Sequence, residues 1–368
     1  MNKIFYVYIV PAFVFASVVM GGGYGTGREI VEFFTIYGLL GGILGSVVSI
    51  CIFGLVLACT YEFARVFKVY DYRSFFKMLI GPFWVCFEIL YLILFLLVLS
   101  VLSSAAGSML EQEYLISKNI GVGILLTLIL FLVYFGRETI EKVLTFWSIF
   151  MYLVFIYYFF EILSNSDTKI LSKLSLGSIE SGWLKGGILY PMYNLAIAPV
   201  LLFSTHAITT RKEAILAGIF SGVIVMVPAM LFHISYSVGY PDVLNQPVPN
   251  YWMISEYSSI YLLIIFLLAL MGPLVQTGAG LVQGFLERIE SSFKSINKNS
   301  LNKLTKITIS SIILILSGVL SSIGIITLIA KGYSALSIGF AFVYIIPVCT
   351  LGLIKIIKFN SSLIDTKR

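Results

Sequence analysis

A glycine-rich stretch near the N-terminus carries the residue types that could bind a ligand. Residues 21–29 read Gly-Gly-Gly-Tyr-Gly-Thr-Gly-Arg-Glu within a hydrophobic segment. Each glycine costs a helix about 1 kcal/mol relative to alanine, so we expect the helix to break here. A break leaves free carbonyls on one half-helix and free amides on the other, a cation site beside an anion site. Arg28 and Glu29 follow at once, where apolar surroundings demand that charges be compensated or functional.

Two other interpretations of this stretch account for fewer of its residues. Glycines four apart, such as Gly21 and Gly25, also fit close helix packing. Packing alone does not require the adjacent Arg28 and Glu29. A phosphate-binding loop would need a Lys-Ser/Thr pair and a preceding strand, and the sequence has neither.

A second interruption is predicted about 170 residues further on. Pro191 and Pro199 flank Asn194 in the segment Tyr-Pro-Met-Tyr-Asn-Leu-Ala-Ile-Ala-Pro. A discontinuous helix and a merely kinked one both fit this pattern. Paired interruptions in the two halves of a membrane protein are typical of a transport site.

Further polar residues lie inside apolar segments. Glu88 is either a protonatable group in a cavity or a neutral, hydrogen-bonded one. Glu62, near the cytoplasmic end of its segment, is expected either to snorkel or to form a gate pair, with Arg65 as the candidate partner, rather than to contact a substrate. Gln276 and Thr277 could supply oxygens to an ion, although such side chains also bond to their own helix.

The amino-acid composition indicates that these residues lie on membrane-spanning helices. Hydrophobic residues make up 59% of the 368 residues and charged residues 11%, and the mean hydropathy is +1.00. This excludes an ordinary soluble domain. The net charge of +6 comes from loops and predicts no nucleic-acid partner, and the four cysteines lack metal-ligand spacing. No cleavable signal peptide is expected.

The hydrophobic pattern predicts an all-α polytopic membrane protein with about ten transmembrane helices. The expected spans are 4–35, 38–66, 80–110, 119–135, 138–163, 186–208, 213–239, 256–290, 306–330 and 333–357. Lys and Arg concentrate in alternate loops, which predicts both termini in the cytoplasm. Five spans are an odd number, so a second set of five would be inverted relative to the first. The predicted parts are a first repeat at 1–163, an extracellular connection at 164–185, a second repeat at 186–357 and a tail at 358–368.

Residues 21–29, with this length and span pattern, resemble the YkvI family of uncharacterised bacterial membrane proteins. That family looks like a distant branch of the amino acid–polyamine–organocation superfamily, whose fold is the LeuT type. The resemblance implies two inverted five-helix repeats, discontinuous helices 1 and 6, and a central site with helices 3 and 8 alongside. Carried over by position, the substrate-binding residues are Gly22, Gly23, Tyr24, Gly25, Thr26, Gly27, Arg28, Glu29, Glu88, Tyr193, Asn194, Ala196 and Ala198.

The resemblance also implies where a coupling ion binds. A sodium ion would lie between Val19 and Gly22 on helix 1 and Thr277 on helix 8, with Gln276 nearby. Proton-coupled relatives place a lysine of helix 5 there, and Lys142 is the candidate. The superfamily's usual first-helix pattern lacks the Arg-Glu pair, which leaves room for a substrate other than an ordinary neutral amino acid.

The sequence therefore predicts a secondary active transporter of a small amino acid- or amine-like solute, working by alternating access with sodium or protons. It is expected in a bacterial cell membrane, with the bilayer and the solute as partners and with no cofactor besides a sodium ion. The alternative is a transporter-like sensor that binds the solute without moving it. An enzyme is not expected, because no nucleophile, base or metal ligands cluster. The oligomeric state is left open.

Overall fold

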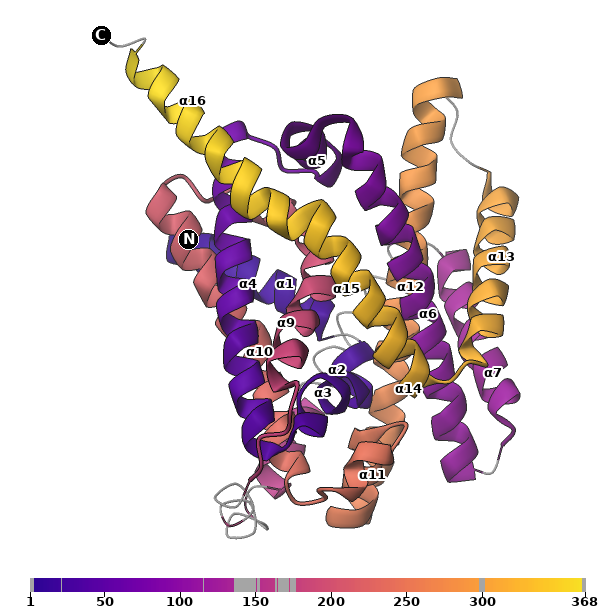
Figure 1. Ribbon diagram of the computed structural model, residues 1–368. Helices are drawn as coiled ribbons and strands as arrows, with labels where there is room; N and C mark the ends of the chain where they lie inside the picture. The colour runs from indigo at the N-terminus through magenta and orange to yellow at the C-terminus, as the bar shows by residue number, and fades with distance from the viewer. Residues whose placement is uncertain are drawn as a thin grey trace.

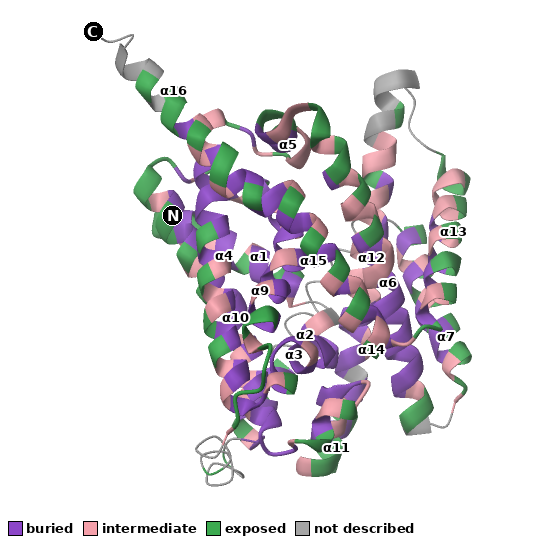
Figure 2. Ribbon diagram, in the orientation of Figure 1, coloured by how far each residue is buried: buried purple, intermediate pink, exposed green. Residues whose placement is uncertain are grey.

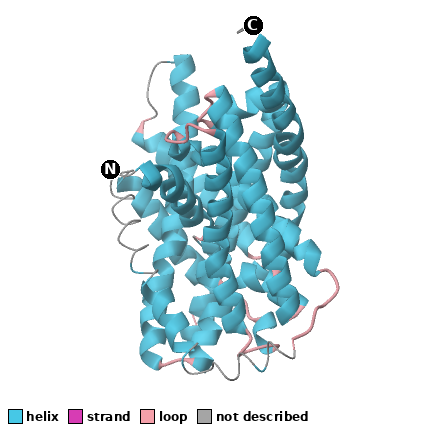
Figure 3. Ribbon diagram, turned by 90° about the vertical axis from the view of Figure 1, so that its left-hand side faces the viewer, coloured by secondary structure: helices cyan, strands magenta, loops and turns pink. Residues whose placement is uncertain are grey.

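The computed structural model describes residues 3–20, 22–114, 116–135, 150, 153–162, 164, 172, 177–297 and 302–365. Within these residues every regular element is a helix (Figure 1; Figure 3). In the described part of the chain, eight helices are long and apolar enough to cross a membrane: Leu39–Phe67, Tyr72–Gln112, Lys118–Phe135, Trp183–Thr205, Arg211–Tyr236, Ile260–Glu290, Lys303–Ser321 and Ile325–Phe359. The all-α, multi-spanning prediction is confirmed.

Two shorter apolar helices, Phe5–Val19 and Leu153–Ile162, lie where the first and fifth spans are expected. The count of ten and its division into inverted repeats stay predictions. The first described helix begins, and the last one ends, toward the same end of the molecule (Figure 1). Of the predicted connection 164–185, residues 177–185 are described as a continuous stretch, and the last three begin α9.

The first hydrophobic segment is broken, as its glycines predict. It comprises η1 (Phe5–Ile9), α1 (Val10–Val19), α2 (Gly22–Thr26), α3 (Arg28–Phe33) and η2 (Thr35–Tyr37). Helix α1 ends at Met20, whose amide donates to the Ala16 carbonyl at 2.8 Å. Gly27 separates α2 from α3 with φ of 76°, a left-handed conformation that glycine adopts without steric cost.

The next helices extend the bundle to its other side. They are α4 (Leu39–Phe67), α5 (Tyr72–Ile80), η3 (Gly81–Phe83), α6 (Trp84–Tyr114) and α7 (Lys118–Phe135). Residues 72–79 lie between the expected spans 38–66 and 80–110, and the structure shows that they belong to a helix, α5. Asp71 caps this helix by accepting a hydrogen bond from the Ser74 amide, and Phe75, Phe76 and Leu79 are buried.

The predicted interruption of the sixth helix takes a different form from an unwound segment. α9 (Trp183–Asn194) passes directly into η4 (Leu195–Thr205), a 3-10 helix of 11 residues. Pro199 lies inside η4 and has no amide hydrogen for the carbonyl four residues earlier, so an α-helical pattern cannot continue there. A 3-10 run of this length is uncommon and is often a sign of function. Helix 6 is therefore changed in type rather than broken.

The remaining elements complete the bundle. They are α10 (Arg211–Tyr236), η5 (Asp242–Asn245), α11 (Pro249–Tyr257), α12 (Ile260–Asn297), α13 (Lys303–Ser321), α14 (Ile325–Thr327), η6 (Leu328–Tyr333), α15 (Ser334–Phe340), η7 (Ala341–Ile345), η8 (Val348–Gly352) and α16 (Leu353–Asp365). Residues 240–255, between the expected spans 213–239 and 256–290, hold η5 and most of α11 as two separate short helices. α11 covers α2 and α3 at the lower end of the molecule in Figure 1.

The core of the molecule surrounds the broken segment. α1 packs against α10 and η4, and α4 packs along both α9 and α10. Buried residues concentrate along these helices, whereas exposed ones lie on the outer surface (Figure 2). Many exposed side chains are large and apolar, among them Phe83 and Phe342. An apolar outer surface of this kind suits contact with lipid chains.

Replacing glycine by alanine should have opposite effects at Gly218, where α10 packs closely against α4, and at Gly123 of α7. A Cβ at Gly218 would overlap the backbone of Ala58, whereas a Cβ at Gly123 meets nothing within 4 Å. Gly218→Ala should lower the melting temperature, because overpacking costs about 1–3 kcal/mol. Gly123→Ala should leave it unchanged or raise it, because alanine favours a helix by about 1 kcal/mol. Thermal unfolding of the two purified proteins checks this, and equal shifts would contradict the packing.

Candidate functional site

We call the interrupted first segment, η1 to η2 (Phe5–Tyr37), helix 1, and α9 with η4 helix 6. A side chain of α11 bonds to the backbone at the break in helix 1. Asn250 Nδ2 donates to the carbonyls of Tyr24 and Gly25, at 2.6 and 3.2 Å. Its Oδ1 accepts a hydrogen bond from Tyr236 Oη of α10 at 2.5 Å. Asn250 is 1% exposed. Backbone carbonyls that α-helical bonding leaves free therefore find a protein partner, which a break at membrane depth requires.

Glycine is required at residue 27 for two reasons. Its positive φ disfavours a side chain, and a Cβ there would overlap Tyr236 Oη and the Asn250 amide. Thr26 Oγ1 also donates to the Gly23 carbonyl at 3.2 Å. The short helix α2 is thus fixed between a turn at Met20 and a left-handed residue at its other end.

Glu29 connects the break in helix 1 to helix 6. Its carboxyl is buried, with the residue 5% exposed, and Oε2 accepts a hydrogen bond from Tyr193 Oη at 2.5 Å. The same carboxyl lies against Gly23, where an added Cβ would come within 2.6–2.7 Å of its carbon and both oxygens. One carboxyl group therefore touches α2 and α9 while being carried by α3.

Aromatic side chains surround this carboxyl. We call Tyr24, Tyr190, Tyr193 and Tyr333 the tyrosine cluster. Tyr190 Oη donates to Tyr24 Oη at 2.9 Å, and Tyr24 Oη donates to the Val225 carbonyl at 2.8 Å. The ring centroids of Tyr193 and Tyr333 are 4.5 Å apart. The cluster joins α2, α9, α10 and η6 around one buried point.

Arg28 does not pair with its neighbour Glu29. Its Nη1 donates to the carbonyls of Leu244 and Gln246 at 2.6 and 3.1 Å, and its Nη2 donates to Glu32 Oε2 at 2.9 Å. The residue is 2% exposed. Arg28 therefore ties α3 to the segment around η5, and its positive charge is compensated by Glu32.

The other residues predicted for the site divide into two groups. Asn194, Ala196 and Ala198 are buried where α9 becomes η4, and Asn194 Nδ2 donates to the Tyr190 carbonyl at 3.1 Å. Val19 is buried at the end of α1. The partly buried residues Gln276 and Thr277 lie on α12, which packs against α2. Lys142 lies outside the described residues.

Glu88, which is also predicted to contact the substrate, lies near the start of α6. Glu88 comes shortly after α5 and η3 in the chain. Its Oε1 is 3.5 Å from Arg288 Nη1. That guanidinium lies over the rings of Tyr72 and Tyr91, at 4.3 and 4.2 Å. The positive charge next to Glu88 therefore comes from α12, a helix distant in the sequence.

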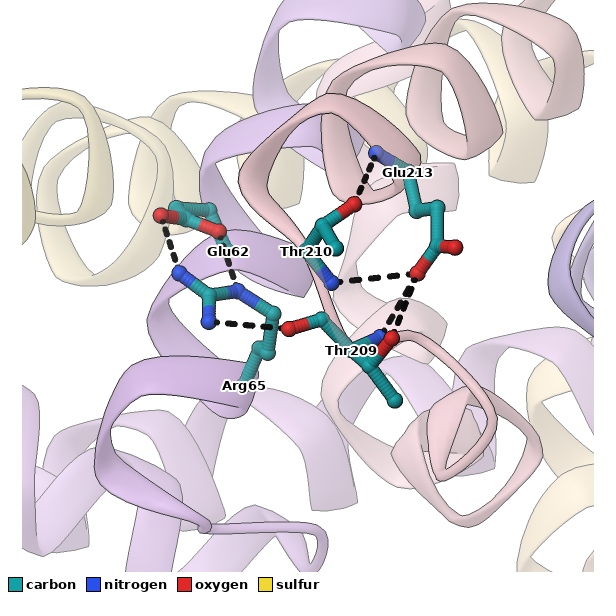
Figure 4. A network of polar contacts seen from close by, with 5 residues as sticks. All are labelled: Glu62, Arg65, Thr209, Thr210 and Glu213. Atoms are coloured by element: carbon teal, nitrogen blue, oxygen red, sulfur yellow. Dashed lines mark hydrogen bonds and ion pairs between the residues drawn. The ribbon is translucent and has the colours of Figure 1, made fainter.

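A second polar network lies at the end of α4 (Figure 4). Arg65 binds both carboxylate oxygens of Glu62, at 2.7 and 2.8 Å, and donates to the Thr209 carbonyl at 3.2 Å. The predicted Glu62–Arg65 pair is confirmed. Glu213 accepts hydrogen bonds from Thr209 and Thr210 and pairs with Lys3 at 2.6 Å. This network joins α4, the η4–α10 link and the N-terminal segment.

Four residues at the break are not predicted from the sequence: Asn250, Tyr236, Tyr190 and Tyr333. The local sequence feature that could have pointed to Asn250 is its position directly after Pro247-Val-Pro249. Nothing local in the sequence pairs it with carbonyls more than 220 residues away. Within the described part of the chain, no three His, Cys, Asp or Glu residues gather as a metal site would require.

Comparisons with known proteins agree with a transporter fold. No protein-family profile matches the chain. It is 26% identical over 291 residues to the "Uncharacterized membrane protein YkvI" of Bacillus subtilis (strain 168), covering 76% of this chain and 80% of that protein. A manganese transporter of Eremococcus coleocola, crystallised with an aromatic bis-isothiourea compound, superposes with a TM-score of 0.51 at 14% identity, over 93% of this chain and 78% of that one. A Na+-coupled sialic acid symporter in a substrate-bound outward-open state gives 0.53 at 12% identity, over 93% and 87%. At these identities, the structural likeness shows a shared fold alone.

Asn250 predicts a measurable stability effect. Asn250→Leu removes the donors to Tyr24 and Gly25 and the acceptor of Tyr236, so several buried polar groups lose their partner. Each such group costs about 1–3 kcal/mol, and the melting temperature should fall clearly. The control is Asn245→Leu, because Asn245 is exposed in η5. Equal melting temperatures for the two variants would contradict the role of Asn250.

Proposed function

We propose that this protein is a secondary transporter that moves a small organic solute, amino acid- or amine-like, across a bacterial cell membrane by alternating access. The observation that supports this most is the contact between two irregular helices. The broken helix 1 meets helix 6 where it changes from α to 3-10, through Glu29–Tyr193 and Tyr24–Tyr190. The fold shared with two transporters supports the same conclusion.

The proposed solute site lies at this contact. Its residues are Gly22–Gly27 on helix 1 and Tyr193, Asn194, Ala196 and Ala198 on helix 6, next to Glu29. Irregular backbone in a membrane is tolerated where it is buried in protein or lines a cavity, and its polar groups suit a small polar ligand. A solute that binds the carbonyls of Tyr24 and Gly25 would displace Asn250 from them.

Two polar networks would serve as gates on either side of this site. Arg28 bonds to η5 and to the residue after it on one side, and Arg65 bonds to Glu62 and Thr209 on the other. Each of these hydrogen bonds can be exchanged for one to water when that end opens, which limits the free-energy cost of opening. The excess of Lys and Arg in the loops at the Arg65 end supports a cytoplasmic position for the Arg65 network. A sodium ion at Val19, Gly22, Gln276 and Thr277, or a proton, would couple the movement to a gradient.

Asn194 offers the first test of the site. A screen of amino acids, amines and nucleobases by thermal shift, with sodium and pH varied, identifies a stabilising solute. Counterflow of that solute into proteoliposomes then measures transport. Asn194→Ala should raise the half-saturating solute concentration about tenfold, because one polar contact of 1.4 kcal/mol corresponds to that factor. The exposed Asn245→Ala is the control and should behave as wild type.

Two outcomes would contradict the proposal. A solute that stabilises the protein but shows no counterflow would make the protein a sensor on a transporter fold. Counterflow with unchanged affinity in Asn194→Ala would place the site elsewhere.

A further inference from the structure

Glu29 is a buried carboxyl group without a positive partner in the described part of the chain. It accepts a hydrogen bond from Tyr193, a neutral donor, and none of the ion pairs there includes it. The nearest guanidinium in sequence, that of Arg28, is bound to Glu32 and to two carbonyls. A buried carboxylate in this situation is costly, so its charge must be neutralised by something that binds it.

The elements packed against α3 offer no other cation to Glu29. These elements are α2, η2, α9, α10, η5, α11, α14 and η6. Their charged residues Lys185, Lys331, Asp242 and Glu256 are exposed, and Arg211, Lys212 and Glu213 lie at the far end of α10. His233 of α10 is bonded to Thr35 and to the Leu39 carbonyl. The other titratable side chains are tyrosines: Tyr24, Tyr37, Tyr190, Tyr193, Tyr236, Tyr251, Tyr257 and Tyr333.

Among the described residues, the carbonyls of Gly23, Tyr24 and Gly25 in the break already accept hydrogen bonds. The Gly23 carbonyl accepts hydrogen bonds from Thr26 Oγ1 and from the Gly27 amide. The carbonyls of Tyr24 and Gly25 accept from Asn250. Sodium in a protein needs several oxygens directed at one point, as other hard cations do. The carboxyl also lies directly on Gly23, which leaves little room on that side for an ion or an ammonium group.

A proton needs neither extra ligands nor extra space. We propose that Glu29 is the group that binds the coupling proton, so that the transporter proposed above is driven by a proton gradient. This inference rests on the proposed function, and it assigns coupling to helix 1 rather than to Lys142 or to a sodium site.

Proton binding at Glu29 is connected to the two interrupted helices. With the proton on, the neutral acid fits the closed arrangement, in which α3 contacts Gly23 and Tyr193. When the proton leaves to water, the carboxylate favours a state in which water reaches it, which requires α2, α3 and α9 to separate. One proton enters from the water on one side and leaves to the water on the other, and no bond other than O–H forms or breaks.

Infrared spectroscopy tests the proton site without any solute, because the probe is the proton itself. Difference spectra of the purified protein between acidic and alkaline pH should contain a protonated-carboxyl band that is absent in Glu29→Gln. The band should persist in the control Glu256→Gln, whose carboxyl is exposed on α11. In Tyr193→Phe it should move to higher frequency, because the carboxyl loses its hydrogen-bond donor. An identical carboxyl band in wild type and Glu29→Gln would overturn the proposal.

Transport separates this inference from the proposed function. For the solute found in the screen, an inward gradient of one pH unit should support about tenfold accumulation at zero membrane potential if one proton moves per solute. Glu29→Gln should abolish this accumulation, whereas the control Glu256→Gln should retain it. Wild-type counterflow without proton-driven accumulation would overturn proton coupling alone. Absence of counterflow in wild type would overturn the transporter itself.

Discussion

The hydrogen bond between Tyr193 and Glu29 is the contact on which the site depends. It joins a helix that glycines have broken to a helix that proline has changed in type, and it does so through a buried carboxyl group. In an apolar environment such a group cannot remain charged and unpartnered. The arrangement of α2, α3 and α9 is therefore sensitive to what neutralises Glu29, whether a proton or another ligand. This sensitivity is what a coupled transporter requires of its central site.

The remaining polar groups at the break are satisfied by parts of the chain that are distant in sequence. Asn250 holds two carbonyls of helix 1, and Arg28 holds two carbonyls near η5. Both connections reach between helix 1 and the segment that follows α10. The covering segment and the broken helix are consequently bound to each other by exchangeable hydrogen bonds rather than by hydrophobic packing alone. Such bonds can be replaced by water when the site opens.

The position of the break can be predicted from the sequence, but the side chain that bonds to its carbonyls cannot. Five glycines within residues 21–27 predict interrupted helix from local propensity, and an apolar composition predicts spanning helices. The pairing of Asn250 with Tyr24, and of Arg288 with Glu88, depends on how distant helices pack, which no local pattern encodes. For the same reason the sequence does not show how the adjacent Arg28 and Glu29 are accommodated: Arg28 pairs with Glu32, and Glu29 accepts a hydrogen bond from Tyr193. At helix 6 the prolines predicted irregularity but not the 3-10 form.

Accessibility of a single residue to each side of the membrane tests alternating access at this site most directly. Ala196 is buried at the start of η4, and the four native cysteines can be replaced so that Ala196→Cys carries the only thiol. A membrane-impermeant thiol reagent is then applied to oriented vesicles from one side or the other. The account predicts that the cysteine reacts from both sides and that the transported solute slows both reactions. Reaction from one side only, unaffected by the solute, would contradict it.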